Sequence, residues 1–242
     1  MKTTGHSLSD EMNMLRALAA AWPICLGYLA IGMAFGVLAR QAGLAIYQIA
    51  LMSMIVFAGS AQFIAVSMIT SGASALSIII TTFMVNLRHL LMSSSLTLHL
   101  KGKNKAILSL FAYGVTDESF AVNLGKFLDG DWSLKDALVV NHVANITWII
   151  STILGGYAGR FIPAGAFGID YALTGMFLCL LVFQLRGRLY VLVSVAAGLL
   201  SVVFYLIIPG NAYVIIASAL AATLGVAIKS WYMHKRKQGE EQ

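Results

Sequence analysis

Charged residues are scarce in this chain: Asp, Glu, Lys and Arg make up 11% of its 242 residues, against about 25% in a soluble domain. That fraction is too small to cover a globule in water. With 59% hydrophobic residues and a mean hydropathy of +0.83, the composition fits lipid as the solvent. A soluble protein with an oversized core is the disfavoured alternative. We therefore predict an all-α, polytopic transmembrane helical bundle.

The sequence also lacks several motifs, and their absence argues against further classes of protein function. The two cysteines, Cys25 and Cys179, lie in separate apolar runs without metal-ligand spacing, which predicts neither a disulfide nor a metal site. The net charge is +6, but no basic stretch is interleaved with aromatics, so no nucleic-acid partner is expected. The sequence has no nucleophile elbow, no zinc-protease motif and no phosphate-binding loop. We expect neither an enzymatic activity nor a cofactor. Energy would have to come from an ion gradient or from a partner.

Apolar runs of the roughly 20 residues needed to cross a bilayer recur along the chain. They are Leu18–Ala39, Leu44–Met68, Leu76–Leu98, Leu134–Tyr157, Ala166–Leu185, Leu189–Ile208 and Ala212–Trp231. An eighth segment, Ala106–Phe127, is only moderately apolar. With short loops and no soluble insert, residues 1–242 are predicted to form a single permease domain.

Loop charge distinguishes seven spans from eight. If Ala106–Phe127 does not cross, twelve Lys and Arg residues face one side and three face the other, with Arg88 inside the membrane. If it crosses, the best split is ten to five. We therefore predict about seven spans, with the N-terminus outside and the C-terminus in the cytoplasm. Eight spans is the alternative.

The middle of Leu44–Met68 has an unusual composition, Phe57-Ala58-Gly59-Ser60-Ala61-Gln62-Phe63. Glycine lowers helix stability by about 1 kcal/mol relative to alanine, and secondary transporters expose backbone groups at mid-membrane through broken helices. The segment therefore predicts either a broken second helix or close packing through small residues.

A faint internal repeat is also present. Gly32-x-x-x-Gly36, Ala50-Leu51-x-x-Met54 and Gln62 recur 122 or 123 residues later as Gly155-x-x-x-Gly159, Ala172-Leu173-x-x-Met176 and Gln184. In the seven-span topology three spans separate corresponding helices, so the halves 17–128 and 134–232 would be inverted copies. Chance similarity between apolar segments is the alternative.

Polar residues at membrane depth are costly and therefore informative. The third segment contains Asn86-Leu87-Arg88-His89 near its middle, and a central Arg costs about 2.5–3.5 kcal/mol. Arg88 is expected to pair and pin the fold, to hold a substrate carboxylate or to snorkel to an interface. His89 is expected either to bond within the bundle or to relay protons, because imidazole titrates near physiological pH.

Two further polar sets follow. Asp117 and Glu118 are adjacent and cannot share one helix face, so we expect one to pair with Arg88 while the other faces water or titrates. A solvated pair on an interfacial helix is the alternative. Asn141 and Asn145 share one face of their helix, where they either form interhelical hydrogen bonds or line the pathway.

Three of these blocks, in order, resemble the signature blocks of the AzlC family, the large subunit of bacterial branched-chain amino acid exporters. The blocks are Phe57–Phe63, Asn86–His89 and Tyr113-Gly114-Val115-Thr116-Asp117-Glu118-Ser119-Phe120. The early Gly27-Tyr28 and Phe35-Gly36 are also similar to its first helix. The resemblance implies a secondary exporter of leucine, isoleucine, valine and often methionine. It also implies the bacterial plasma membrane and a small AzlD-type membrane partner.

The blocks and the physical argument together define the candidate site. The candidate substrate-binding residues are Gly59, Ser60, Gln62, Asn86, Arg88, Asn141 and Asn145. The candidates for proton coupling or gating are His89, Asp117 and Glu118. Two other functions fit the same sequence: a non-transporting membrane scaffold whose polar residues hold helices together, and an uptake permease or channel for another small solute.

Overall fold

The computed structural model describes residues 4–163, 168, 171, 174–175, 178, 181–182, 185, 187–207, 216–217 and 220–230, with side chains from residue 12 onward. The chain divides into two compact units, Met1–Thr174 and Gly175–Gln242. Most of the predicted span Ala166–Leu185 and part of Ala212–Trp231 lie outside the described residues, as does Gln184 of the sequence repeat.

Long apolar helices dominate the described residues. In the first unit these are α1 (Thr4–Gln41), α4 (Ala75–Thr97) and α7 (Leu134–Ala158), and the second unit contains α9 (Arg188–Ile207) and a shorter helix over Leu220–Ser230. The four long helices are apolar enough to cross a membrane. The predicted helical membrane bundle is confirmed.

Large apolar side chains on α4 point outward. Leu76, Ile79, Phe83 and Leu91 are each more than 60% exposed. A row of this kind on a helix with a polar centre is explained by contact with lipid rather than water.

The predicted broken second helix is present between α1 and α4. It consists of α2 (Ile46–Ile55) and α3 (Gly59–Thr70), separated at residues 56–58. Phe57 at this break has a φ of 39°, a left-handed conformation that is uncommon for a bulky residue. The two helices have 10 and 12 residues, so each is only about half as long as the hydrocarbon core is thick.

The contacts of α2 show that it runs antiparallel to α7. Near its start, Ile49 lies against Gly156 close to the C-terminal end of α7. One turn later, the Ser53 hydroxyl accepts a hydrogen bond from the Thr152 hydroxyl at 2.9 Å. α2 therefore enters the unit from the end where α1 and α7 finish, and it stops at mid-depth.

The next helix, α3, returns to the same end. Phe63 in its first half packs edge-on against Phe35 of α1, with ring centroids 5.2 Å apart. Further along, Thr70 shares a cavity wall with Gln41, the last residue of α1. Since α3 runs parallel to α1 while α2 runs against it, α2 and α3 form a re-entrant helical hairpin. The expectation that Leu44–Met68 crosses the membrane is not met.

A second hairpin enters from the opposite end. It consists of α5 (Lys105–Tyr113) and α6 (Asp117–Asp129), joined at residues 114–116. Asn141 bonds the Phe111 carbonyl of α5 at 3.1 Å and the Asn123 side chain of α6 at 2.9 Å. Both helices therefore pass the same level of α7, in opposite directions. This geometry agrees with the prediction that Ala106–Phe127 does not cross.

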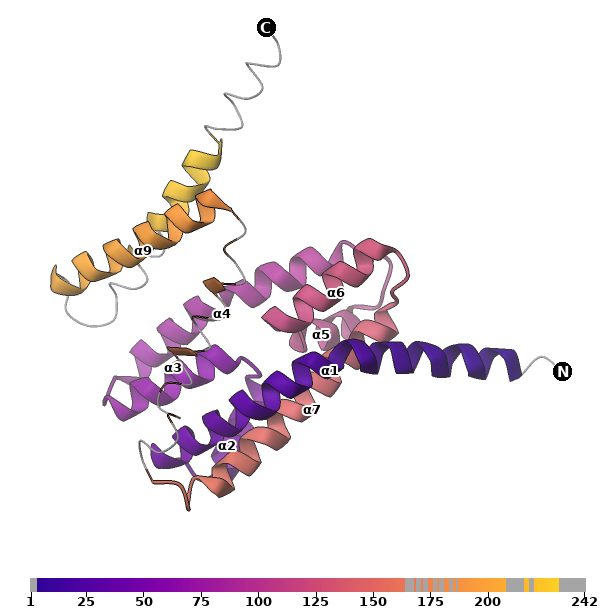
Figure 1. The fold of residues 1–242 in the computed structure, drawn as a ribbon, viewed down its shortest axis with the longest axis horizontal. Coiled ribbons are helices and arrows are strands. Elements are labelled where there is room, and N and C mark those ends of the chain that lie inside the picture. Colours follow the sequence, from indigo (N-terminus) through magenta and orange to yellow (C-terminus); the bar gives the residue numbers. More distant parts are fainter. Residues whose placement is uncertain are drawn as a thin grey trace, which may run out of the picture. The chain divides into compact units, whose positions relative to one another are not determined.

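The scaffold of the unit is a close parallel pair, α1 and α7 (Figure 1). A Cβ atom added at Gly36 would overlap the Thr152 carbonyl, and one added at Gly155 would overlap the Met33 carbonyl. Glycine permits this approach because it has no side chain. α1 and α7 point in the same direction, so the predicted pairing of Gly32 with Gly155 does not relate inverted copies.

An inverted arrangement does exist, at a shorter spacing. α4 runs antiparallel to α1 and α7. Its start follows α3 after a short turn, and Leu96 near its end packs in a core cluster with Phe111 and Ala137. Each of α1 and α4 is followed by a half-length hairpin, and α5 and α6 begin 59 and 58 residues after α2 and α3. The segments α1–α3 and α4–α6 are therefore inverted copies in architecture.

Local sequence explains the ends of these helices. Side chains of Ser74, Asn104, Thr116 and Ser133 accept backbone hydrogen bonds at the starts of α4, α5, α6 and α7, as N-cap residues do. Gly130 ends α6 in the left-handed region. The start of α3 differs, because its N-cap residue Ala58 has no side chain that can cap.

Candidate substrate site at the hairpin tips

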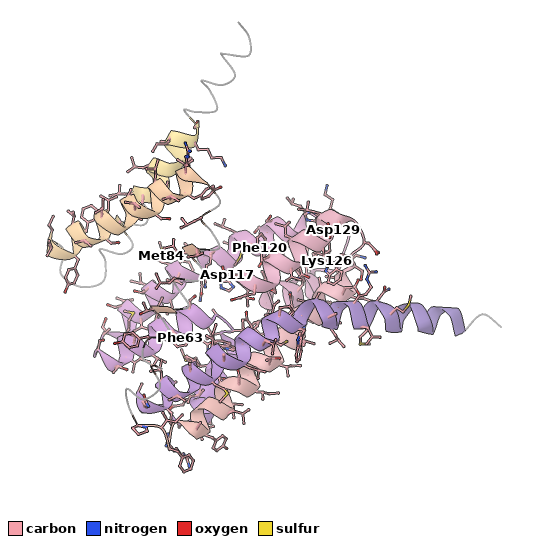
Figure 2. The ribbon with its side chains drawn as sticks, viewed as in Figure 1. Phe63, Met84, Asp117, Phe120, Lys126 and Asp129 are labelled. Carbon is pink, nitrogen blue, oxygen red and sulfur yellow. The ribbon has the colours of Figure 1, made fainter. Side chains whose placement is uncertain are left out.

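The two hairpin tips meet in the middle of the first unit. The Tyr113 hydroxyl at the end of α5 donates a hydrogen bond to the Met54 carbonyl of α2, and the rings of Tyr113 and Phe57 lie 6.1 Å apart. Figure 2 shows Asp117, at the start of α6, in the centre of the unit, and Lys126 and Asp129 at the far end of that helix. Helix starts and ends are thus gathered at mid-membrane, where backbone groups are otherwise unavailable.

Arg88 of α4 connects both tips. Its Nη1 lies 2.8 Å from Oδ2 of Asp117, and its Nη2 donates a hydrogen bond to the Ser60 hydroxyl in the first turn of α3. The two charged side chains are 28% and 22% exposed. Asp117 also lies in the first turn of α6, where the helix dipole favours a negative charge. The predicted pairing of Arg88 with one of the two carboxylates is present.

The second carboxylate has a different partner. The Tyr28 hydroxyl of α1 donates a hydrogen bond to Oε2 of Glu118 at 2.8 Å and lies 2.8 Å from Oγ1 of Thr116. Thr116 and Ser119 form a capping box at the start of α6. The adjacent carboxylates therefore diverge, with Asp117 directed to α4 and Glu118 to α1. The sequence predicts this divergence, but not the contact of Glu118 with Tyr28 in place of water.

Three buried polar atoms on one stretch of α4 lack a hydrogen-bond partner among the described residues. They are Oδ1 of Asn86, Nε of Arg88 and Nε2 of His89. His89 bonds the Val115 carbonyl through Nδ1 at 2.8 Å. Because a carbonyl only accepts, Nδ1 carries a proton, and Nε2 of the neutral imidazole is an acceptor. The site thus offers two unused acceptors and one unused donor, although buried polar groups are normally paired.

Aromatic side chains line one side of the tips. Trp148 of α7 packs against Tyr28 at 5.2 Å and against Phe35 at 6.0 Å between ring centroids, and Gly59 lies directly against the Trp148 ring. Phe35 in turn contacts Phe63. This layer encloses the charged groups on the α1 and α7 side.

Several predicted binding residues instead form hydrogen bonds to other helices or to neighbouring side chains. Gln62 is fully buried, donates to Ser53 at 3.2 Å and accepts from Trp148 Nε1 at 2.9 Å. Asn141 is fully buried and bonded to α5 and α6, and Asn145 donates to the Tyr113 hydroxyl at 3.3 Å. These contacts fit the interhelical alternative, and the open part of the site consists of Ser60, Asn86, Arg88, His89, Asp117 and Glu118.

Sequence reasoning did not place Tyr28 or Thr116 at the site, and it placed Trp148 only on the helix face shared with Asn141 and Asn145, without a binding role. Tyr28 and Trp148 lie in apolar runs, where an aromatic residue predicts packing. The signals that could have found them were the polar hydroxyl and indole N–H, which need partners when they are buried. The site contains two carboxyl groups, of Asp117 and Glu118, and one guanidinium group, of Arg88.

The comparisons with known proteins bear on this same region. A family model described as "AzlC protein" matches residues 23–162, which contain both hairpins and every residue of the site. The chain is also 30% identical to the branched-chain amino acid transport protein AzlC of Bacillus subtilis, over 91% of this chain and 89% of that protein. The chain belongs to the AzlC family.

Other membrane proteins are similar to the chain over most of their length. The chain is 32% identical to a membrane protein of Archaeoglobus fulgidus, over 90% of this chain and 96% of the relative. It is 26% identical to the inner membrane protein YgaZ of Escherichia coli, over 76% and 78%. No solved structure matches the chain. The AzlC family membership and the apolar helices establish a multi-pass membrane protein with a role in transport.

Proposed function

We propose that this chain exports branched-chain amino acids, and methionine, across the bacterial plasma membrane by proton-coupled secondary transport together with a small AzlD-type membrane subunit. The observation that carries this proposal is the Arg88–Asp117 ion pair between the two hairpin tips. The Bacillus subtilis relative, a branched-chain amino acid transport protein, supports the substrate class.

A zwitterion can enter this ion pair without changing its charge. The amino acid carboxylate takes the place of Asp117 at the Arg88 guanidinium, where Nε and the start of α3 offer further donors. The ammonium group then faces the released Asp117 carboxylate and the unused acceptors of Asn86 and His89. Every charge in the opened pair has an opposite partner, which low-dielectric surroundings require.

The wall opposite the charges suits an apolar side chain. Phe57 and the aromatic layer of Tyr28, Phe35, Phe63 and Trp148 lie beside the tips. A branched aliphatic or thioether side chain gains from contact with such rings, whereas a charged side chain would lose its hydration there.

Glu118 is the group that would carry the coupling proton. A zwitterion balances Arg88 and Asp117 but leaves the Glu118 charge uncompensated, and a proton removes that charge. Tyr28 holds the carboxylate at 2.8 Å, so proton binding acts on a contact between α1 and α6. Glu118 is thereby suited to couple protonation to movement of the second hairpin.

Counterflow of labelled leucine and methionine in proteoliposomes, with and without the small subunit, tests the proposal. We expect saturable exchange that responds to an imposed pH gradient. Exchange only with the subunit would make the chain one half of a two-subunit transporter. No exchange in either case, from protein shown to be folded, would contradict the proposal and favour the scaffold function that the paired Gln62, Asn141 and Asn145 also fit.

A further inference from the structure

The first unit has two distinguishable ends, and each hairpin opens to one of them. The turns between α1 and α2 and between α3 and α4 lie at the end where α1 and α7 finish. The turns from α4 to α5 and from α6 to α7 lie at the other end. In Figure 1 the α2–α3 and α5–α6 pairs accordingly lie toward opposite ends of α7.

Basic residues are distributed unequally between these ends. At the α5–α6 end there are six in the described first unit: Arg16, Lys101, Lys103, Lys105, Lys126 and Lys135. At the α2–α3 end there are two, Arg40 and Arg160. Short cytoplasmic loops carry the excess of Lys and Arg in membrane proteins.

We infer that the α5–α6 hairpin opens to the cytoplasm and the α2–α3 hairpin opens to the outside, so that each hairpin lines one half of the transport pathway. The start of α1 then lies on the cytoplasmic side. This reverses the orientation expected from the sequence, which rested on a crossing by Leu44–Met68 that the re-entrant hairpin removes. The orientation stands on geometry and charge alone, whereas the pathway rests on the proposed function.

A cavity of about 330 Å³ lies on the inferred outer side, between the end of α1 and α3. Its walls include Leu38 and Gln41 of α1, Phe63 and Ser67 of α3, and Ser71 directly after α3. It combines apolar side chains with hydroxyl and amide groups, which suits an amino acid with an apolar side chain.

The cavity-lining face of α3 leads toward the ion pair. At about 100° per residue, Ser60, Phe63, Ser67 and Ser71 fall on one face of α3. Ser60, at the inner end of this face, accepts the hydrogen bond from Arg88. Phe63 lies between and is only 3% exposed, because its ring packs against Phe35. The cavity is therefore the outer vestibule of the site, and Phe63 with Phe35 closes it from the ion pair.

The orientation can be tested by thiol labelling in cells, in a background with Cys25 and Cys179 replaced by alanine. Single cysteines replace Leu44 and Ala75, beside the two turns of one end, and Lys103 and Asp129, at the other. A membrane-impermeant maleimide should label L44C and A75C on intact cells, and K103C and D129C only after the membrane is opened. Labelling of L44C and A75C from opposite sides would overturn the hairpin, and labelling of both only from inside would overturn the orientation. Neither result depends on transport activity.

The vestibule is tested by a matched pair on α3. Ser67 lines the cavity, whereas Ile69 lies on the opposite face of the helix. S67C should react with a hydrophilic maleimide from outside, excess leucine should slow the reaction several-fold, and the modified protein should lose leucine exchange. I69C should react slowly and without a leucine effect. Equal behaviour of S67C and I69C would overturn the vestibule. A leucine effect on S67C in a protein without exchange would instead contradict only the proposed transport.

Discussion

Arg88 of α4 and Asp117 of α6 form an ion pair of 2.8 Å at the point where two half-length hairpins from opposite ends of the unit meet. The same guanidinium bonds Ser60 at the start of α3. One side chain therefore connects both breaks in the helical scaffold. A ligand that competes for it acts on both hairpins together, which is the requirement for alternating access around a fixed site.

Neutralising one member of this pair should be more harmful than neutralising both. Breaking a buried ion pair from one side costs about 3–5 kcal/mol when burial is complete, and a smaller loss is expected at 28% and 22% exposure. We expect R88Q and D117N to lower thermal stability in detergent, and the double variant to recover part of it. All three should lose leucine counterflow.

The exposed pair Arg16–Asp131, at 50% and 82% side-chain exposure, is the matched control. Exposed pairs contribute about 0–1 kcal/mol, so R16Q should retain stability and exchange. Normal counterflow by correctly inserted R88Q would exclude Arg88 as the carboxylate anchor.

Variants of Glu118 and Asp117 should separate proton coupling from substrate binding. E118Q keeps the shape of the side chain and removes the titrating group. We expect it to exchange leucine for leucine but to lose the response to an imposed pH gradient. Y28F retains the carboxylate but removes its contact with α1, so it should weaken that response without abolishing it. The measurement is counterflow at equal pH compared with uptake driven by a pH step, with D129N at the exposed end of α6 as control. An unchanged pH response in E118Q would transfer the coupling role to another group.

Parts of this arrangement follow from the sequence for clear physical reasons. The break near Phe57 is one of the two alternatives predicted from the sequence, because Gly59 at the centre of an apolar run lowers helix stability. The Arg88–carboxylate pair follows from the cost of a lone charge in lipid. Both arguments use only the residue and its own segment, so they need no knowledge of neighbouring helices.

The direction of α3 could not be predicted in the same way. Two half-length helices and a tip contain about as many apolar residues as one full span, so hydropathy does not distinguish a hairpin from a crossing. Only contacts such as Phe63 with Phe35 show the return. The role of Gln62 depended on Trp148, which is 86 residues away in the sequence. A polar residue at depth signals a partner without saying whether that partner is protein or substrate.

Gln62 provides a test that distinguishes packing from binding. Its amide connects Ser53 to Trp148 in the core of the first unit. Q62L leaves the buried Trp148 indole N–H unpaired, at about 1–3 kcal/mol, whereas Ser53 keeps its hydrogen bond with Thr152. We expect a clear loss of thermal stability, with relative counterflow rates for leucine, valine and methionine unchanged in the protein that remains folded. Replacing Trp148 by Phe in the same chain removes one unpaired group and should restore part of the stability. A change in substrate preference in Q62L would return Gln62 to the substrate site.

The close pairing of α1 and α7 predicts opposite effects for two glycines on one helix. A Cβ at Gly36 would overlap backbone atoms of Thr152 and Gly155, whereas one at Gly27 would meet nothing within 4 Å. G36A should therefore force the helices apart, with an overpacking cost of about 1–3 kcal/mol. G27A should be neutral or stabilising by up to about 1 kcal/mol, because alanine favours the helix. Because Tyr28 and Trp148 lie on these two helices, G36A should also slow exchange. Equal thermal stability of the two variants would contradict the close parallel contact between α1 and α7. It would also remove the basis for assigning each hairpin to one end of the first unit.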